Sequence, residues 1–201
     1  MGAVTMGKAG GPLDRREVVA ALLEDRQDIL VVTGLGSPSY DVMAAGDHEN
    51  NYYLWAAMGS AMTVGLGLAK AQPSKKVLVI TGDGEALMGF GALATLALQQ
   101  PANLTVAVLD NGHYAETGMQ VSHAGRGIDL DRVAQTCGFA WTASITDMEG
   151  VAELRRQVDA KDGLKLATIK IRAENLPRVL PPRDGSFIKN RFRTALGFAP
   201  I

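Results

Sequence analysis

Apolar and polar positions along the chain predict buried strands that alternate with helices. Four apolar runs, at residues 28–36, 75–84, 103–112 and 164–173, have the length and composition of strands. The first two are apolar on both faces, which is typical of strands covered on both sides of a parallel sheet. This alternation indicates an α/β fold with three layers, α/β/α, around a doubly wound and mostly parallel sheet.

Capping signals at the ends of the intervening segments support the helix predictions. Asp14, with Glu17 three residues later, has the form of a capping box that opens an amphipathic helix. Thr146 and Glu149 repeat this pattern further along the chain, and Asp129 is expected to cap another helix.

Two longer apolar segments are also predicted to be helical. Residues 85–100 predict one continuous helix after the second strand, and residues 53–71 predict a glycine-spaced helix after a polar loop from Ser37 to Asn51. The segment 53–71 nearly reaches transmembrane length. Its polar approach, its glycines and the nearby Lys70 instead favour a helix buried in a soluble protein, so no membrane contact is expected.

A chain of 201 residues with 47% hydrophobic content is expected to form one compact domain. We place this domain at residues 14–173, after a flexible lead at residues 1–13 that lacks the apolar stretch of a secretory signal. Residues 174–201 form a proline-bearing, basic extension. This extension is interpreted either as a solvated segment packed along the domain or a partner, or as an arm that reaches an anionic substrate.

Charge and cysteine content narrow the choice of partners. Twenty basic and 21 acidic residues give a formal net charge of −1, so no overall field favours nucleic acid or an anionic membrane. Small molecules and other proteins are the expected partners. Cys137 is the only cysteine, which predicts no disulfide within the chain and a reducing, cytoplasmic compartment.

Glycine and polar residues follow the second and third strands where each strand ends. Gly82, Asp83 and Gly84 follow one strand, and Asn111 follows the next, about one βαβ unit later. Because ligands bind at the carboxyl ends of parallel strands, both side chains are expected at one edge of the sheet. Carboxylate and amide oxygens suit magnesium, and the N–H groups of a helix starting near Glu85 suit a diphosphate.

Other interpretations of these glycines are weaker. A Gly-Asp-Gly triplet alone is also typical of a tight turn between a strand and a helix. Two polar motifs one βαβ unit apart favour a binding site instead. No G-x-G-x-x-G motif follows a strand, which disfavours a dinucleotide fold, and no glycine-rich run ends in Gly-Lys-Ser/Thr as a P-loop requires.

Residues 82–114 resemble the thiamine diphosphate-binding motif, which opens with Gly-Asp-Gly and closes with Asn-Asn. Asp110 stands where the first Asn is usual, whereas Asn111 matches the second. Residues 50–71 resemble the Phe-Tyr…Gly-x-Met-Gly segment in the diphosphate-binding chains of sulfopyruvate and phosphonopyruvate decarboxylases. The chain therefore resembles the thiamine diphosphate-dependent 2-oxoacid decarboxylase family.

The resemblance implies a set of site residues. Magnesium would be bound by Asp83, Asn111 and the backbone carbonyl of His113. In the family, the residue matching Met58 supports the bent cofactor, and the carbonyl matching Ala56 accepts a hydrogen bond from its aminopyrimidine. The implied cofactor-binding residues are Ala56, Met58, Gly82, Gly84, Glu85, Ala86, Asn111, His113 and Tyr114.

The resemblance also implies a partner. In the family, an essential glutamate comes from a separate pyrimidine-binding domain, and this chain has room for only one domain. We therefore expect no catalytic residue of that kind here. The prediction is the diphosphate-binding subunit of an α2β2 lyase that converts a sulfopyruvate- or phosphonopyruvate-like 2-oxo acid to an aldehyde. An acetolactate synthase-like carboligase, a 2-oxoacid:acceptor oxidoreductase beta subunit and a non-enzymatic partner-binding module remain alternatives.

Four loop residues are further candidates for the border of the site: His48, Glu49, His123 and Arg126. Each is also typical of an ordinary polar surface residue. Arg126 and the basic extension are of interest because planar guanidinium groups suit a sulfonate or a phosphonate.

Overall fold

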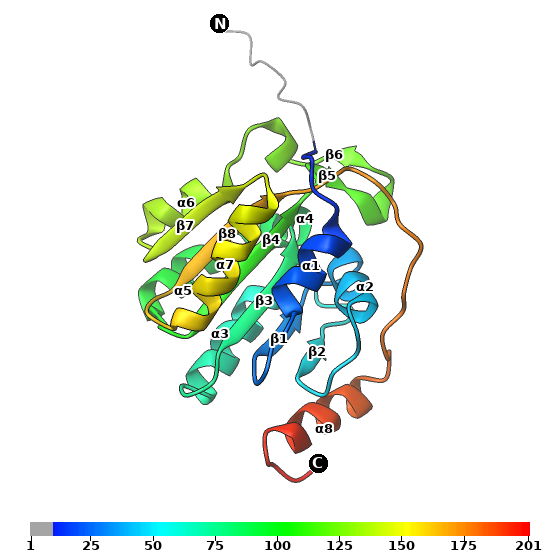
Figure 1. The fold of residues 1–201 in the computed structure, drawn as a ribbon, viewed down its shortest axis with the longest axis vertical. Helices are drawn as coiled ribbons and strands as arrows, with labels where there is room; N and C mark the ends of the chain where they lie inside the picture. Colours follow the sequence, from blue (N-terminus) through cyan, green and yellow to red (C-terminus); the bar gives the residue numbers. More distant parts are fainter. Residues whose placement is uncertain (1–9) are drawn as a thin grey trace, which may run out of the picture.

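The computed structural model describes residues 10–201, which form a central sheet with helices on both faces (Figure 1). The helices are α1 (Arg15–Leu23), α2 (Ser37–Ala44), α3 (Ala61–Ala71), α4 (Asp83–Met88), α5 (Ala92–Gln99), α6 (Leu130–Cys137), α7 (Met148–Ala160) and α8 (Gly185–Ala195), with 3₁₀ turns η1 (Ala115–Thr117) and η2 (Ala124–Arg126). The strands are β1 (Leu30–Thr33), β2 (Asn51–Tyr53), β3 (Val77–Gly82), β4 (Leu104–Asp110), β5 (His113–Tyr114), β6 (Gln120–Val121), β7 (Trp141–Ile145) and β8 (Lys165–Lys170).

The main sheet has six parallel strands in the order β2-β1-β3-β4-β8-β7. The chain runs outward from β1 to β2 and then returns to place β3 on the other side of β1. From there it continues in the opposite direction to β4. The predicted doubly wound parallel sheet is therefore confirmed, and the reversal between β1 and β3 is the kind of point where such sheets bind ligands.

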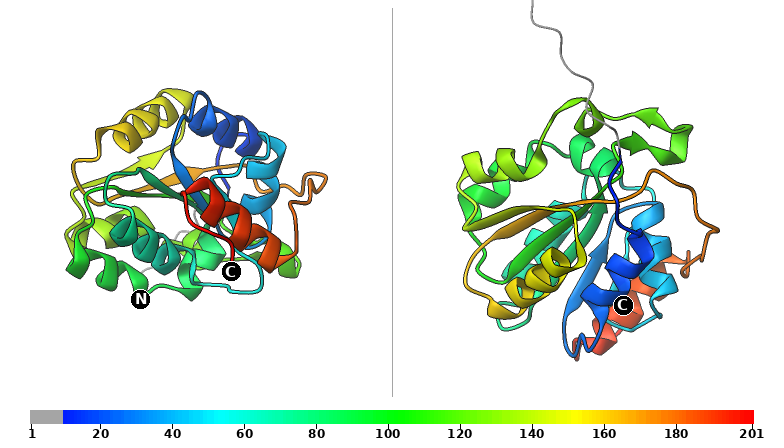
Figure 2. Two further views of the ribbon diagram at one scale, coloured as in Figure 1. Left: turned by 90° about the horizontal axis from the view of Figure 1, so that it is seen from below. Right: turned by 45° about the horizontal axis from the view of Figure 1, so that its top comes forward.

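Helices cover the sheet on both faces, as the end-on view in Figure 2 shows. One hydrophobic cluster joins α1, α2 and α7 to the first face, and a second joins α3, α5 and α6 to the other. All residues of β1 and of β4 are buried, because each of these strands has a helix layer on either side. The predicted three-layer arrangement is confirmed.

The segment between β1 and α3 differs from its prediction. The polar loop predicted over residues 37–51 contains α2, whose inner face is buried, and the start of the edge strand β2. The helix predicted over residues 53–71 begins only at Ala61. Ala56 and Gly59, with φ of 56° and 84°, keep the preceding loop out of the helical conformation. Among residues 10–201, no helix has both the length and the apolar character to cross a membrane.

The single helix predicted over residues 85–100 is two helices. α4 ends at Met88 and α5 begins at Ala92. At the break, Gly89 packs directly against the backbone of Gly59, and a Cβ on Gly59 would lie only 2.9 Å from the Gly89 nitrogen. The loop before α3 is thus drawn against the end of α4, which two glycines allow.

The predicted helix caps have different outcomes. Asp14 accepts hydrogen bonds from two backbone N–H groups in the first turn of α1, so this N-cap is confirmed. The cap of α7 is Asp147 rather than Thr146, because the Asp147 carboxylate reaches the backbone N–H three residues on. Asp129 occupies the N-cap position of α6 but makes no side-chain capping bond there.

The N-terminal end of the described chain packs on the sheet. The flexible lead was predicted over residues 1–13, and residues 1–9 lie outside the described residues. Leu13 is buried and forms a parallel bridge with Ile171, just beyond β8. Leu13, the last residue of the predicted lead, is therefore part of the packed domain.

The edge strand β7 and the helix α8 were also not predicted. Asp184 caps α8, and Ile188 and Phe192 on its inner face are buried, one in each hydrophobic cluster. α8 contacts β2 and lies beside this edge strand at the lower end of Figure 1. The extension thus packs along the domain, as one of its two interpretations expects, and shields an edge of the sheet.

Candidate functional site

A cavity of about 170 Å³ opens at the carboxyl ends of β1, β3 and β4, where the sheet reverses direction. A single water requires roughly 10–15 Å³, so this space can take a ligand. Most of its walls come from the turn after β1, the Gly-Asp-Gly segment after β3, the residues after β4, and the loop before α3. Arg15 of α1, Asp41 of α2 and Ile171 after β8 complete the lining.

The cavity brings together most of the residues predicted for the site. Its lining includes Met58, Gly82, Asp83, Gly84, Glu85, Asn111, His113 and Tyr114. Two predicted residues are placed elsewhere. Ala86 is buried in the core on the inner side of α4, and Ala56 lies on the loop that carries Met58.

Asp83 is a buried carboxylate at this edge. It is the first residue of α4 and is 2% exposed. Burial, followed by the negative charge of Asp110, raises the pKa of Asp83 to about 7. The hydroxyl of Ser122, buried after β6, donates a hydrogen bond of 2.5 Å to Asp83 Oδ2. No ion pair to Asp83 exists among the described residues, so its ionised form lacks a counter-ion.

Asp110, which departs from the family motif, is held in an ion pair. Nζ of Lys170 in β8 lies 2.5 Å from Asp110 Oδ2, and the two residues are paired in the sheet register. Asp110 Oδ1 accepts a hydrogen bond of 2.9 Å from the N–H of Gly112. An asparagine could accept the same bond but would leave Lys170 unpaired. The additional negative charge near Asp83 is therefore matched by a cation from the neighbouring strand.

The turn after β4 leads into a short hairpin over the cavity. Asn111 Oδ1 accepts a hydrogen bond of 2.8 Å from the N–H of His113. Further along the hairpin, Tyr114 Oη lies 2.6 Å from His123 Nδ1. A Cβ on Gly84 would lie 2.7 Å from the ring of Tyr114. The hairpin thus lies against the Gly-Asp-Gly segment, and the absence of a side chain at Gly84 makes this approach possible.

Glu85 has a role that no sequence motif indicated. Its buried carboxylate accepts hydrogen bonds from the N–H groups of Gly59 at 2.9 Å and Ala61 at 3.1 Å, and from the hydroxyl of Thr81. These N–H groups lie at the start of α3, where Ser60 makes no side-chain capping bond. Glu85 therefore caps α3 from another helix and anchors the loop before it.

This anchored loop carries Met58 to the cavity. Met58 was predicted on a helix, but it lies in the loop and its side chain is 46% exposed. Two residues earlier, Ala56 adopts a left-handed conformation with φ of 56°. Such a conformation costs a residue with a Cβ about 1–2 kcal/mol, and strain of this kind often accompanies functional loops.

Replacing Ala56 by glycine is expected to raise the free energy of unfolding by about 0.5–1 kcal/mol, because glycine adopts positive φ without steric cost. Ala57→Gly is the matched control, since Ala57 is not among the residues with positive φ. That control should lower the stability or leave it unchanged. Urea unfolding of both variants measures the difference, and equal destabilisation by the two changes would contradict strain at Ala56.

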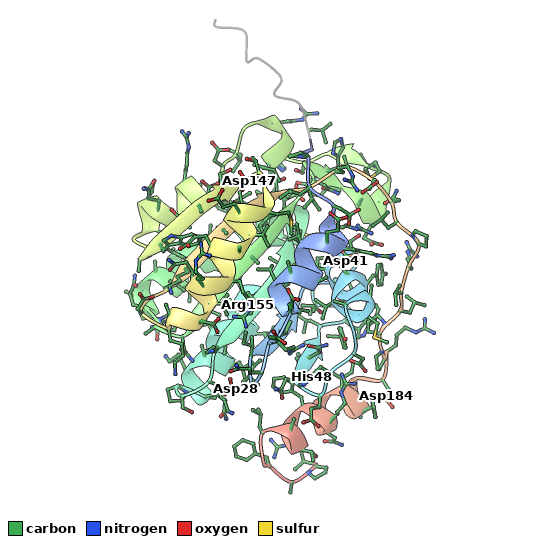
Figure 3. All side chains as sticks on the ribbon, in the orientation of Figure 1. Asp28, Asp41, His48, Asp147, Arg155 and Asp184 are labelled. Atoms are coloured by element: carbon green, nitrogen blue, oxygen red, sulfur yellow. The ribbon has the colours of Figure 1, made fainter. Side chains whose placement is uncertain are left out.

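The loop candidates have different positions. His48 and Glu49 connect α2 to the start of β2, at the edge opposite the cavity, and Figure 3 shows His48 near α8. Neither residue borders the cavity, because the loop before a parallel strand lies at its amino end, and of their two interpretations the one that places them at the site is not supported. His123 lies at the rim through its contact with Tyr114. Arg126 is exposed on η2 and forms no ion pair among the described residues.

The turn between β1 and α2 supplies cavity residues that were predicted only as the end of the first strand, for Leu35, or as part of a polar loop, for Ser37 and Pro38. Leu35, Ser37 and Pro38 line the cavity opposite the Gly-Asp-Gly segment. Gly36, with φ of 81°, reverses the chain there. The sequence does contain a signal for this part of the cavity, because Gly34 and Gly36 follow the first strand at its carboxyl end, as Gly82 and Gly84 follow the second.

Comparison with known proteins finds relatives over nearly the whole chain. Residues 37–169 match the family "Thiamine pyrophosphate enzyme, C-terminal TPP binding domain". The chain is 35% identical over 180 residues to sulfopyruvate decarboxylase subunit beta of Methanothermobacter thermautotrophicus, covering 90% of this chain and 94% of that protein. It is 35% identical over 184 residues to phosphonopyruvate decarboxylase of Streptomyces viridochromogenes, covering 89% of this chain and 45% of that protein.

The relatives differ in length. The chain spans about half of two of the curated relatives it matches, 47% and 45% of their sequences. Among solved structures, benzoylformate decarboxylase from Polynucleobacter necessarius matches with a TM-score of 0.65 at 18% identity, over 83% of this chain and 34% of that one. At this identity the likeness concerns the fold alone, and it agrees with the parallel three-layer arrangement.

Proposed function

The chain belongs to the thiamine pyrophosphate enzyme family, whose C-terminal TPP-binding domain it matches over residues 37–169, and from this membership we propose that it is one subunit of a two-chain lyase. In this proposal the chain binds magnesium and the diphosphate of thiamine diphosphate (TPP), and with its partner it decarboxylates a 2-oxo acid to an aldehyde. The observation that carries the proposal is that Asp83 and Asn111 line one cavity at the point where the sheet reverses direction.

The side chains at the cavity fit a magnesium ion. Among residues 10–201, no three His, Cys, Asp or Glu side chains form a metal-binding cluster, so a metal here would depend on mixed oxygen donors. Magnesium prefers such donors and keeps positions for phosphate oxygens. We assign the carboxylate of Asp83, the side chain of Asn111 and the backbone carbonyl of His113 as its ligands. The cation would supply the counter-ion that buried Asp83 lacks.

The other cavity residues would bind and orient the cofactor, which supplies an electron sink for decarboxylation when bound. Gly82 and Gly84 leave the backbone accessible to the diphosphate. Met58 would support the thiamine rings, and the carbonyl of Ala56 would accept from the aminopyrimidine. Glu85 would act indirectly, because its carboxylate holds the loop that carries these two residues. The backbone of Ala86 and the side chain of Tyr114 complete the assigned set.

An exposed apolar rim around the site supports a partner subunit. Met58, Met88, Phe90 and Ile128 are 40–61% exposed, and the last three line a neighbouring hollow with Tyr114. Large apolar side chains gathered in this way are typical of protein interfaces. We propose that a pyrimidine-binding domain covers this rim, supplies the catalytic glutamate and completes an α2β2 assembly. The name "subunit beta" of one relative agrees with a two-chain enzyme.

The proposed substrate is a 2-oxo acid with a second acidic group, because sulfopyruvate and phosphonopyruvate appear in the names of the relatives. Cys137 is the only cysteine of the chain, and it supports the reducing, cytoplasmic compartment predicted from the sequence.

Reconstitution with the partner chain tests this function. For this experiment, the partner chain is obtained as the protein that co-purifies with this chain from its natural host. The complex is expected to bind TPP only in the presence of Mg²⁺ and to release carbon dioxide and an aldehyde from sulfopyruvate or phosphonopyruvate. Neither chain alone should do so.

The same experiment separates the alternatives. A product with a new carbon–carbon bond would indicate a carboligase, and reduction of an acceptor dye by 2-oxo acids would indicate an oxidoreductase. A complex that binds no TPP with Mg²⁺ would contradict the proposal and favour a non-enzymatic module.

A further inference from the structure

Arg15, the first residue of α1, brings a buried guanidinium to the same cavity. Its side chain is only 3% exposed, and it lines the cavity together with Ser37 and Asp83. No sequence motif points to it, since it lies about 70 residues before Asp83 in the chain. A charged side chain at this depth normally requires a partner of opposite charge.

The partner that Arg15 has within the protein is shared. Asp41 of α2 is fully buried, and its Oδ2 lies 3.3 Å from Nε of Arg15, while its Oδ1 lies 3.6 Å from Nε of Arg16. Figure 3 shows Asp41 where α1 and α2 meet. One carboxylate therefore faces two guanidinium groups, which leaves a net charge of +1 in this cluster.

The two arginines differ in their other contacts. Arg16 is partly exposed and donates from Nη2 to the carbonyl oxygen of Pro177, while its Nε, like that of Arg15, is buried without a hydrogen-bond partner. Arg15 makes no side-chain hydrogen bond within residues 10–201, and its Nε and both oxygens of Asp41 are buried without hydrogen-bond partners. Of the two, only Arg15 lines the cavity.

We propose that Arg15 binds the terminal phosphate of the cofactor's diphosphate. This inference rests on the function proposed above and adds a residue to that site. Magnesium bound to ionised Asp83 keeps a net charge of only +1, which is less than the negative charge of a diphosphate, and the guanidinium of Arg15 at the cavity supplies part of the difference. A guanidinium also presents a planar fork of N–H donors that matches phosphate oxygens. Asp41 orients this group from the other side and is a positioning residue.

The experiment compares binding of TPP and of thiamine monophosphate by the complex with its partner, using calorimetric titration at fixed Mg²⁺. In Arg15→Gln the affinity for TPP is expected to fall about 10- to 100-fold, the range for a lost hydrogen bond to a charged group. The affinity for thiamine monophosphate should change little, so the preference for the diphosphate is reduced. Arg15→Lys should lie between, because it keeps the charge and loses the fork.

Arg16→Gln is the matched control, since Arg16 faces the same carboxylate but not the cavity. It is expected to keep the TPP affinity within about twofold, as for a partly exposed ion pair. If Arg15→Gln does not fold, Arg15→Gln/Asp41→Asn removes both buried charges and is tested in its place. Circular dichroism and thermal melting establish that each variant is folded.

Three results would overturn the proposed role of Arg15. An unchanged preference for diphosphate over monophosphate in the folded Arg15 variant would overturn the inference and leave the proposed function intact. An equal loss in Arg16→Gln would also overturn it, because the effect would then come from the ion-pair cluster as a whole. If the wild-type complex binds no TPP with Mg²⁺, the proposed function and this inference fail together.

Discussion

Asp83→Ala is expected to abolish magnesium-dependent binding of TPP by the complex of this chain with its partner. Asp83 is the only charged group among the assigned magnesium ligands, and Asn111 with a backbone carbonyl cannot balance a divalent cation. Loss of more than about 100-fold in affinity is expected, since even residues that only support metal ligands contribute 10- to 100-fold. Calorimetric titration of TPP with and without Mg²⁺ measures the effect.

A second variant separates metal binding from folding. Because burial raises the pKa of Asp83 to about 7, the ionised carboxylate opposes folding at pH values above the pKa of an unfolded aspartate. Asp83→Asn should therefore leave the metal-free chain at least as stable as the wild type while TPP binding is lost. Asp131→Ala, at another buried aspartate outside the cavity lining, is the control and should bind TPP normally. Normal binding by Asp83→Ala would contradict the assigned site.

Gly89→Ala is expected to disturb the site from outside it. An added Cβ would overlap the carbonyl oxygen of Gly59, which is backbone and cannot rotate away. The loop with Met58 would have to move off the end of α4. Overpacking of this kind costs about 1–3 kcal/mol of stability. A displacement near 1 Å at the cofactor can cost about 100-fold in function, so TPP affinity should fall by about 10- to 100-fold.

Gly91→Ala is the matched control two residues away. A Cβ on Gly91 would meet no atom within 4 Å, and its φ of −63° is allowed for alanine. This variant should stay within about 0.5 kcal/mol of the wild type, as most surface substitutions do. Urea unfolding and TPP titration of both variants are the measurements. Similar behaviour of the two would show that the contact between Gly59 and Gly89 does not position the loop.

The central part of the sheet could be predicted because its signal is local. β1, β3, β4 and β8 are apolar runs whose residues are almost all buried, so composition alone identifies them. The meeting of Asp83 and Asn111 followed from a rule about parallel strands rather than from the residues themselves. The resemblance to a known motif then supplied the identity of the ligand.

The elements that were missed depend on contacts between distant parts of the chain. α2 contains a proline and an aspartate, and both residue types are also typical of polar loops. Its packing against α1, which the sequence does not show, favours the helix. β2 has three residues and β7 is largely half-buried, so neither shows a clear alternation. The start of α3 was placed too early because nothing local shows that Ala56 has positive φ.

Within the site, the roles of Glu85 and Ser122 were missed because they too depend on contacts between distant parts of the chain. Glu85 follows Asp83 in the motif, and its neighbourhood suggests a ligand for the diphosphate. Its side chain instead caps α3, through N–H groups 24 and 26 residues earlier in the chain. Ser122 reaches Asp83 across 39 residues. Sequence spacing can locate the ends of strands, but it does not show which loops return to them.

The match to the family begins at residue 37 and ends at residue 169, and these limits do not enclose the sheet. β1, which lies between β2 and β3, precedes the match together with α1. Lys170, the ion-pair partner of Asp110, follows it, as does α8, which shields β2. A fragment cut at the limits of the match would separate β2 from the remaining strands and expose the inner edge of β3. The segment that the family match covers is therefore shorter than the segment that folds.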